Sequence, residues 1–148
     1  MAKLWDKGFN VNEKIDRFTV GKDRELDLLL APYDIRGTIA HITMLESVGL
    51  LKKEELDVLT AELESIFKKT EDGSFRIDDD MEDVHSQVEL MLTDKLGDLG
   101  KKVHTGRSRN DQVLLDIKLF TRAGIKTTAK CKDGKNARVD VGFHSLRH

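Results

Sequence analysis

Apolar residues recur every three or four positions in several separate stretches of the chain, a spacing that predicts amphipathic helices. In the stretch 33–51 the recurring positions are Ile35, Ile39, Ile42 and Leu45, with Met44 beside them. Gly49 predicts the end of this helix, because glycine adopts the left-handed conformation at a helix C-terminus without strain. A short helix over residues 22–31 precedes it. We expect that helix to stop before Pro32, since helical angles are disfavoured for the residue before a proline.

A second amphipathic stretch covers residues 52–69. Its apolar face is formed by Leu56, Leu59, Leu63, Ile66 and Phe67. The two stretches, separated by a tight turn, predict a pair of antiparallel helices. A polar connection follows, with a brief extended stretch expected at Phe75 to Ile77. Helical period then returns over residues 82–97, and Gly97 is the predicted end.

The last helical pattern begins near Ser108, and Val113, Ile117 and Phe120 mark one of its faces. From Gly124 onward the helical period is lost and the charge turns positive.

The sequence therefore predicts an all-α fold in three parts. They are an N-terminal helical domain at residues 1–107, which opens with an irregular arm at 1–21, the start of a further helix at 108–123, and a divergent, poorly ordered tail at 124–148.

Composition and charge narrow the classes of function. The 148 residues carry a formal net charge of −2, which gives no general attraction to nucleic acid or to an anionic membrane surface. The single cysteine, Cys131, excludes an internal disulfide framework and suits a reducing compartment. No stretch has the apolar length of a signal peptide or of a membrane span. We expect a cytoplasmic protein with neither nucleic-acid nor membrane partners.

The polar groups of the chain are most concentrated in the stretch "HTGRSRNDQV", just before the last helical pattern. Ser108 and Asp111 form a capping-box pattern, which predicts a helix that starts at Arg109 or Asn110. A helix N-terminus attracts anions, and Arg107 and Arg109 bracket it with guanidinium groups suited to carboxylates. Asn110 can both donate and accept hydrogen bonds. The stretch predicts recognition of a small, carboxylate-rich molecule.

The bland alternative is that the two arginines pair with the protein's own acids at Asp111, Asp116 or residues 78–83. From spacing alone this alternative is favoured, because capping boxes are common.

A weaker signal comes from His85 and Glu89, which are four residues apart on one helix face. They could form a proton-transfer or orienting pair, but an ordinary contact on a solvated helix is favoured. His41, His85 and His104 lack a recognised ligand spacing and Cys131 has no cysteine partner, so the sequence predicts no metal site.

The order of several longer motifs resembles one enzyme family. "KKVHTGRSRNDQV" is similar to the N-terminal signature of argininosuccinate lyase, within the fumarase/aspartase superfamily. "KLW" at the start, "DIRGTIAHITML" (34–45) and "EDVHSQVELML" (82–92) precede it in the order of the family. The resemblance covers residues 3–122, approximately. It implies the N-terminal helical domain of the fumarase/aspartase-type fold, followed by the start of a long central bundle helix in a homotetramer.

The resemblance also implies a reaction. It is the reversible β-elimination of argininosuccinate to L-arginine and fumarate in arginine biosynthesis, without an organic cofactor or metal. In this chemistry a base removes a proton next to a carboxylate, and an acid assists the loss of the guanidino nitrogen.

Site residues follow from the same resemblance. Ser108, Arg109 and Asn110 match positions that contact substrate in the family. The residues assigned to substrate binding are Ser108, Arg109, Asn110, Arg107, His104, Thr105 and His85. The role implied for His85 is orienting rather than that of the base, and no residue of the chain is assigned as catalytic.

Some features depart from the family pattern. "DKGF" (6–9) stands where Gly-Gly-Arg-Phe is usual, and a substrate-contacting serine has no counterpart, with Thr19 or Gly21 lying nearest. Family enzymes are much longer, and their acid/base histidine and mobile-loop serine come downstream of the matching region. We therefore expect this chain alone to bind substrate weakly and to lack turnover. The tail at 124–148 would then come from a frameshift or a misassigned gene end.

Two other functions remain open. One is a non-catalytic helical assembly or interaction module derived from the family. The other is a sister enzyme acting on a different fumarate adduct. The intact run at residues 104–112 favours the lyase over the module, because assembly alone does not require it.

Overall fold

The computed structural model describes residues 26–78 and 81–132, and every regular element in these ranges is a helix. The elements are α3 (Ala31–Ser47), α4 (Lys53–Glu71), α5 (Val84–Leu96), α6 (Asp98–Lys101), the 3₁₀ helix η1 (Lys102–His104) and α7 (Arg109–Lys132). The all-α prediction is confirmed. The arm at 1–21, residues 22–25 of the helix expected at 22–31, and residues 133–148 lie outside the described ranges.

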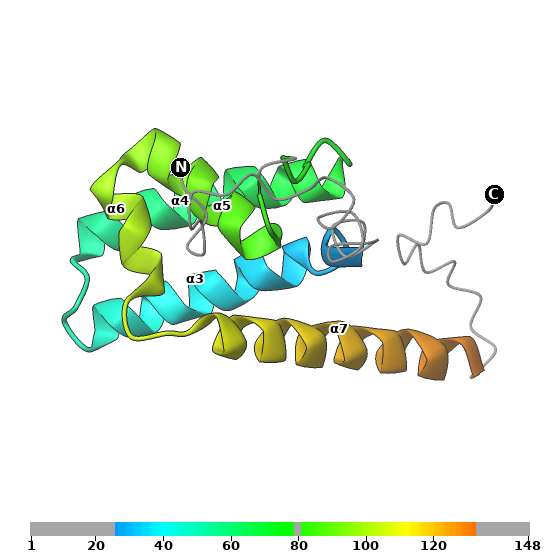
Figure 1. Cartoon of the computed structure of the whole chain (residues 1–148). Coiled ribbons are helices and arrows are strands. Elements are labelled where there is room, and N and C mark those ends of the chain that lie inside the picture. Colours follow the sequence, from blue (N-terminus) through cyan, green and yellow to red (C-terminus); the bar gives the residue numbers. More distant parts are fainter. Residues whose placement is uncertain (1–25, 79–80, 133–148) are drawn as a thin grey trace.

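Helix α3 is the centre of the arrangement. It lies between α7 on one side and α4 and α5 on the other, as Figure 1 shows. The buried core gathers apolar side chains of α3, α4 and α5, of the segments that join them, and of η1. Its members are Ala31, Ile35, Ile42, Leu45, Leu51, Leu56, Leu59, Leu63, Ile66, Phe75, Val84, Val88, Leu92 and Val103. The apolar faces predicted for the first two amphipathic helices are therefore largely the faces that bury.

The predicted helix ends are confirmed where glycine was expected to set them. Gly49 follows α3 with a φ of 79°, and Gly97 follows α5 with a φ of 60°, both in the left-handed region that favours glycine.

One local prediction is wrong. Ala31 is the first residue of α3 rather than the last of a preceding helix, because Pro32 sits in the first turn of α3, where its missing N–H costs nothing. The segment Phe75 to Ile77, expected to be briefly extended, belongs to no helix or strand, and Phe75 is buried in the core.

Helix α7 continues through residues 124–132, where the sequence pattern gave no helical period. Apolar periodicity is weak there, but alanine and lysine have high intrinsic helix propensity. The Thr128 hydroxyl donates to the Gly124 carbonyl at 3.0 Å, so the hydroxyl has a hydrogen-bond acceptor within the helix. The boundary placed at residue 123 therefore does not end the helix.

The polarity of α7 is the reverse of that of an ordinary surface helix. Gln112 and Asp116 are buried against the rest of the protein, whereas Leu114, Ile117 and Ile125 are 55%, 47% and 64% exposed. The apolar face predicted at Val113, Ile117 and Phe120 is exposed only in part. Val113 and Phe120 are half-buried, and the Phe120 ring meets the edge of Tyr33 with 5.8 Å between ring centroids.

Close packing of α6 against α5 depends on the absence of a side chain at Gly100. A Cβ there would lie 2.6 Å from the Leu92 carbonyl carbon and 2.7 Å from the Thr93 nitrogen, both backbone atoms. In α7, by contrast, a Cβ at Gly124 would meet nothing within 4 Å.

We expect Gly100→Ala to lower the free energy of unfolding by about 1–3 kcal/mol, because the helices must separate to admit the methyl group. Gly124→Ala is the matched control and should raise it by about 0.5–1 kcal/mol, since alanine favours the helix. Urea denaturation followed by circular dichroism measures both changes. Equal effects of the two substitutions would contradict the packing described for Gly100.

Candidate functional site

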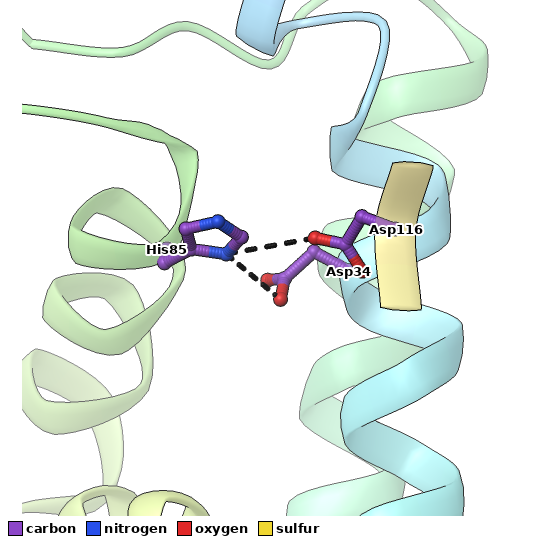
Figure 2. Close-up of side chains that lie close together, drawn as sticks. All are labelled: Asp34, His85 and Asp116. Atoms are coloured by element: carbon purple, nitrogen blue, oxygen red, sulfur yellow. Dashed lines mark hydrogen bonds and ion pairs between the residues drawn. The ribbon is translucent and has the colours of Figure 1, made fainter. Parts of the chain in front are cut away.

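Three titratable side chains from three different helices meet in the interior. They are Asp34 on α3, His85 on α5 and Asp116 on α7, and each is at least 97% buried. His85 Nδ1 lies 3.0 Å from Asp34 Oδ1 and 3.7 Å from Asp116 Oδ2, as the dashed lines in Figure 2 mark. We call this group the three-helix junction. The junction connects α7, the helix that begins at the predicted capping box, to α3 and α5.

The junction has unequal hydrogen bonding. Asp34 Oδ1 accepts from the Gln112 side chain at 3.2 Å in addition to facing the His85 ring. Within the described residues Asp34 Oδ2, Asp116 Oδ2 and Gln112 Oε1 are buried without a hydrogen-bond partner. Such atoms are uncommon in a protein interior, because an unpaired buried polar group loses the bonds it makes to water.

Electrostatics at the junction favour protonated forms. Burial, reinforced by the neighbouring Asp34 carboxylate, raises the pKa of Asp116 to about 7. For His85, burial alone would lower the pKa, but the hydrogen bond to Asp34 and the negative charges around the ring outweigh it, so the net shift is upward. A carboxyl group that is partly neutral at physiological pH and a histidine that tends to be charged therefore lie side by side.

The same three residues offer atoms within 4.8 Å of one another, a spacing that could admit a metal ion. Two observations argue against that role. His85 Nδ1 already engages Asp34, and the Arg107 guanidinium lies close enough to place positive charge beside both carboxylates. The junction is better described as a set of carboxylates balanced by protein cations, and we do not assign the three residues as metal ligands.

Arg107 extends inward from the turn before α7. Its guanidinium donates to the Thr38 hydroxyl on α3 at 3.1 Å and to the Val103 carbonyl at 3.4 Å, while Nε is buried without a partner among the described residues. Burial lowers the pKa of Arg107, although the nearby aspartates oppose this. Arg107 thus reaches α3 and the junction instead of remaining open on the surface.

Arg109 is engaged by the start of α5. Its guanidinium forms an ion pair with Asp83 and lies 3.3 Å from the Ser86 hydroxyl. Asp83 is the N-cap of α5 and accepts from the Ser86 backbone N–H at 2.8 Å. Although burial would raise it, these contacts hold the pKa of Asp83 below its usual value. For Arg109 the structure thus shows pairing with one of the protein's own acids, in residues 78–83, as the bland alternative expected.

The predicted capping box is confirmed. Ser108 donates to Asp111 Oδ2 from both its backbone N–H and its hydroxyl, each at 2.9 Å, and α7 begins at Arg109. Asn110 is exposed, and no hydrogen bond of its side chain occurs within the described part of the chain. We call Ser108, Arg109 and Asn110 the capped turn. Of its three side chains, only that of Asn110 has no partner there.

The remaining predicted site residues lie beside this turn. His104 Nε2 pairs with Glu89 of α5 at 3.0 Å, and burial lowers the pKa of His104. The Thr105 carbonyl accepts from the His41 ring at 3.0 Å, so α3 also holds the approach to α7. His104, Thr105 and the capped turn are thus neighbours in the sequence just before and at the start of α7, whereas His85 lies in the interior on α5.

The suggested His85–Glu89 contact on a solvated helix is wrong, because His85 is buried on Asp34 and Glu89 pairs with His104 instead. Sequence reasoning also missed Asp34, Gln112 and Asp116. Their signal is polar residues at helical spacing on a buried face. Gln112 and Asp116 are four apart, as are Asp34 and Thr38, and the members of each pair share one face.

Comparison with known proteins places this helical arrangement in a class. A family model described as lyase matches residues 15–130, and the chain belongs to this lyase family. The curated relatives are more specific. The chain is 66% identical to the argininosuccinate lyase of Phocaeicola vulgatus and 64% identical to that of Bacteroides thetaiotaomicron, each over 144 residues. It is 43% identical over 131 residues to the argininosuccinate lyase of Thermotoga neapolitana.

Each alignment includes most of this chain but only about a third of the relative. The first two alignments include 97% of this chain but 31% of each relative, and the third includes 88% of the chain and 32% of the relative. The chain therefore corresponds to an N-terminal portion of argininosuccinate lyases. Because the longest alignments include 144 of its 148 residues, they extend into residues 124–148, further than the expected 3–122. Among the described residues, no helix is both long and apolar enough to cross a membrane.

Two roles of Asp83 can be separated by substitution. We expect Asp83→Ala to lower the free energy of unfolding by about 1–2 kcal/mol, because it removes the N-cap of α5 together with the Arg109 ion pair. Asp83→Asn should cost less, since asparagine caps a helix as well as aspartate and only the charge is lost. Urea denaturation of both variants tests this. If the two variants lose the same stability, the cap contributes nothing measurable.

Proposed function

We propose that the chain acts as the N-terminal part of an argininosuccinate lyase, a cytoplasmic homotetramer that cleaves argininosuccinate to L-arginine and fumarate by β-elimination. The observation that carries the proposal is the 66% identity to the Phocaeicola vulgatus enzyme over 97% of the chain. In this proposal no residue of the chain transfers the proton. Its role is to bind and orient the substrate.

The capped turn is the part of the chain best suited to that role. The N–H groups at the start of α7 have no partner within the helix, and the helix dipole favours a negative charge there. Asn110 is exposed at this end and can donate to one substrate group while accepting from another. Argininosuccinate presents three carboxylates, which match such a site.

In this proposal Arg107 and Arg109 do not act as two open receptors for substrate carboxylates, because the protein already engages both guanidinium groups. Their bonds to Thr38 and Asp83 fix the two sides of the capped turn against α3 and α5. A substrate carboxylate could replace Asp83 at Arg109 only by breaking that ion pair. We therefore propose that Asn110 and the N-terminus of α7 contact the substrate first. Arg109 would then exchange its ion pair with Asp83 for one with a substrate carboxylate.

The exposed apolar side chains of α7 support assembly. Leu114, Ile117 and Ile125 lie on the outward side of the helix, and apolar exposure of this extent marks a contact surface. The same observation supports the second candidate, a non-catalytic assembly module derived from the family. The two differ in whether the capped turn binds substrate.

A chimera tests the proposed function. Residues 1–132 would replace the matching part of the Phocaeicola vulgatus enzyme, and fumarate formation would be followed. We expect an active chimera in which Asn110→Ala lowers kcat/KM by about 10²–10³-fold, because a donor aimed at the substrate is lost. Asp94→Asn, an exposed change on α5, is the matched control and should leave the rate unchanged. An inactive chimera would favour the module, and an active chimera that is insensitive to Asn110→Ala would show that Asn110 does not contact the substrate.

The isolated 148-residue chain provides a separate prediction. We expect no fumarate release from it at saturating argininosuccinate, since the proposal assigns both proton-transfer groups to residues outside the chain. The measurement is the fumarate produced by purified chain after prolonged incubation, against the active chimera as positive control. Turnover by the chain alone would show that the proton-transfer groups lie within it.

A further inference from the structure

The three-helix junction has a feature that its hydrogen bonds leave unexplained. Within the described part of the chain, Asp34 and Asp116 each bury one carboxylate oxygen without a hydrogen-bond partner, and these two side chains belong to helices that pack together. One oxygen of each carboxyl group and one ring nitrogen of His85 lie within 4.8 Å of one another. Two buried carboxylates this close repel each other if both are ionised.

One proton removes the conflict. A protonated carboxyl group is a donor, and a neighbouring ionised one is an acceptor, so a single proton can join two adjacent carboxyl groups by a hydrogen bond. The His85 ring adds positive charge next to Asp34, because its Nδ1–H donates to the Oδ1 atom of that carboxylate. Gln112 donates to the same oxygen from α7. Among the described residues, two of the three junction oxygens without a hydrogen-bond partner are thus on the groups that a shared proton would join, and the third is Gln112 Oε1.

We propose that Asp34 and Asp116 share one proton, and that this proton, together with the His85 imidazolium, fastens α7 against α3 and α5. Loss of the proton loosens the docking of α7. The proposal rests on the proposed function in one respect only, namely that the capped turn, two helical turns before Asp116 on the same helix, binds substrate. Asp34, His85 and Asp116 are then positioning residues for that turn.

The charged surroundings of Asp116 determine the sign of the pH dependence. Asp34 and Asp27 raise its pKa, whereas His85 and Arg107 lower it, and burial together with the aspartates prevails. The folded value of about 7 lies above the value of about 3.9 for an unfolded aspartate. This group therefore contributes stability that is fully present below about pH 4 and is lost as the pH rises through about 7. The raised pKa of His85 acts in the same direction.

Urea denaturation of the 148-residue chain at about pH 5.5 and about pH 8 provides the first test. We expect the urea concentration at the wild-type midpoint to be lower at about pH 8 than at about pH 5.5. Asp116→Asn should flatten this dependence and have the higher midpoint at the alkaline value, because its amide can donate to Asp34 at any pH. Asp94→Asn is the control for removing one carboxylate and should follow the wild type. An Asp116→Asn chain with the wild-type pH dependence overturns the proposal.

A measurement on the wild-type chain avoids any effect of substitution on folding. With ¹³C-labelled aspartate, we expect one carboxyl resonance to titrate near neutral pH. Tyr33 is the single tyrosine of the sequence and its ring contacts Phe120 of α7, so its ring resonances should shift over the same pH range. If every aspartate carboxyl titrates in the ordinary acidic range, no proton is shared and the proposal is wrong.

A bound cation is the competing explanation for the unpaired oxygens. We expect MgCl₂, MnCl₂ and ZnCl₂ to shift the denaturation midpoints of the wild type and of Asp116→Asn equally. A rise confined to the wild type would assign the junction to a metal and overturn the shared proton. None of these measurements uses argininosuccinate, so failure here and failure of the lyase proposal are distinguishable.

Discussion

The contact of Asp34, His85 and Asp116 is the interaction on which the position of α7 depends. Helix α7 presents a polar side to the protein and leaves much of its apolar side exposed, so hydrophobic burial provides less of its attachment than it does for α3 and α4. Buried charged groups must be paired or neutralised, and here they are paired across three helices. Such a contact fixes direction and register more sharply than apolar packing does, at some cost in stability.

This attachment connects the interior to the capped turn. Arg107 leaves the turn and reaches Thr38 on α3, Arg109 reaches the N-cap of α5, and the Thr105 carbonyl accepts from His41. The start of α7 is thus held by both neighbouring helices before any ligand is present. A segment held in this way loses little entropy when it binds a ligand, which suits the substrate recognition that we propose for the capped turn.

The sequence predicted the helices better than the site. Apolar spacing found α3, α4 and α5, and Gly49 and Gly97 marked two helix ends, because these features depend on local geometry alone. The capping box at Ser108 is local in the same sense and was found. The junction was not found, because its members are 31 to 82 residues apart in the chain and become neighbours only when three helices pack. Spacing alone favoured pairing of the arginines with the protein's own acids, residues 78–83 among them, and Arg109 does pair with Asp83. The bond from Arg107 to Thr38 was not found, because Thr38 lies on another helix.

The capped turn and the junction lie on one helix, with Ser108 at its start and Asp116 further along the same axis. Each residue added to an α-helix rotates the side chains beyond it by about 100° around the axis. Inserting or deleting a single residue between these two positions would therefore aim Asp116 away from its partners or swing the turn off its supports. Over this segment the protein can accept changes of side chain but not changes of length.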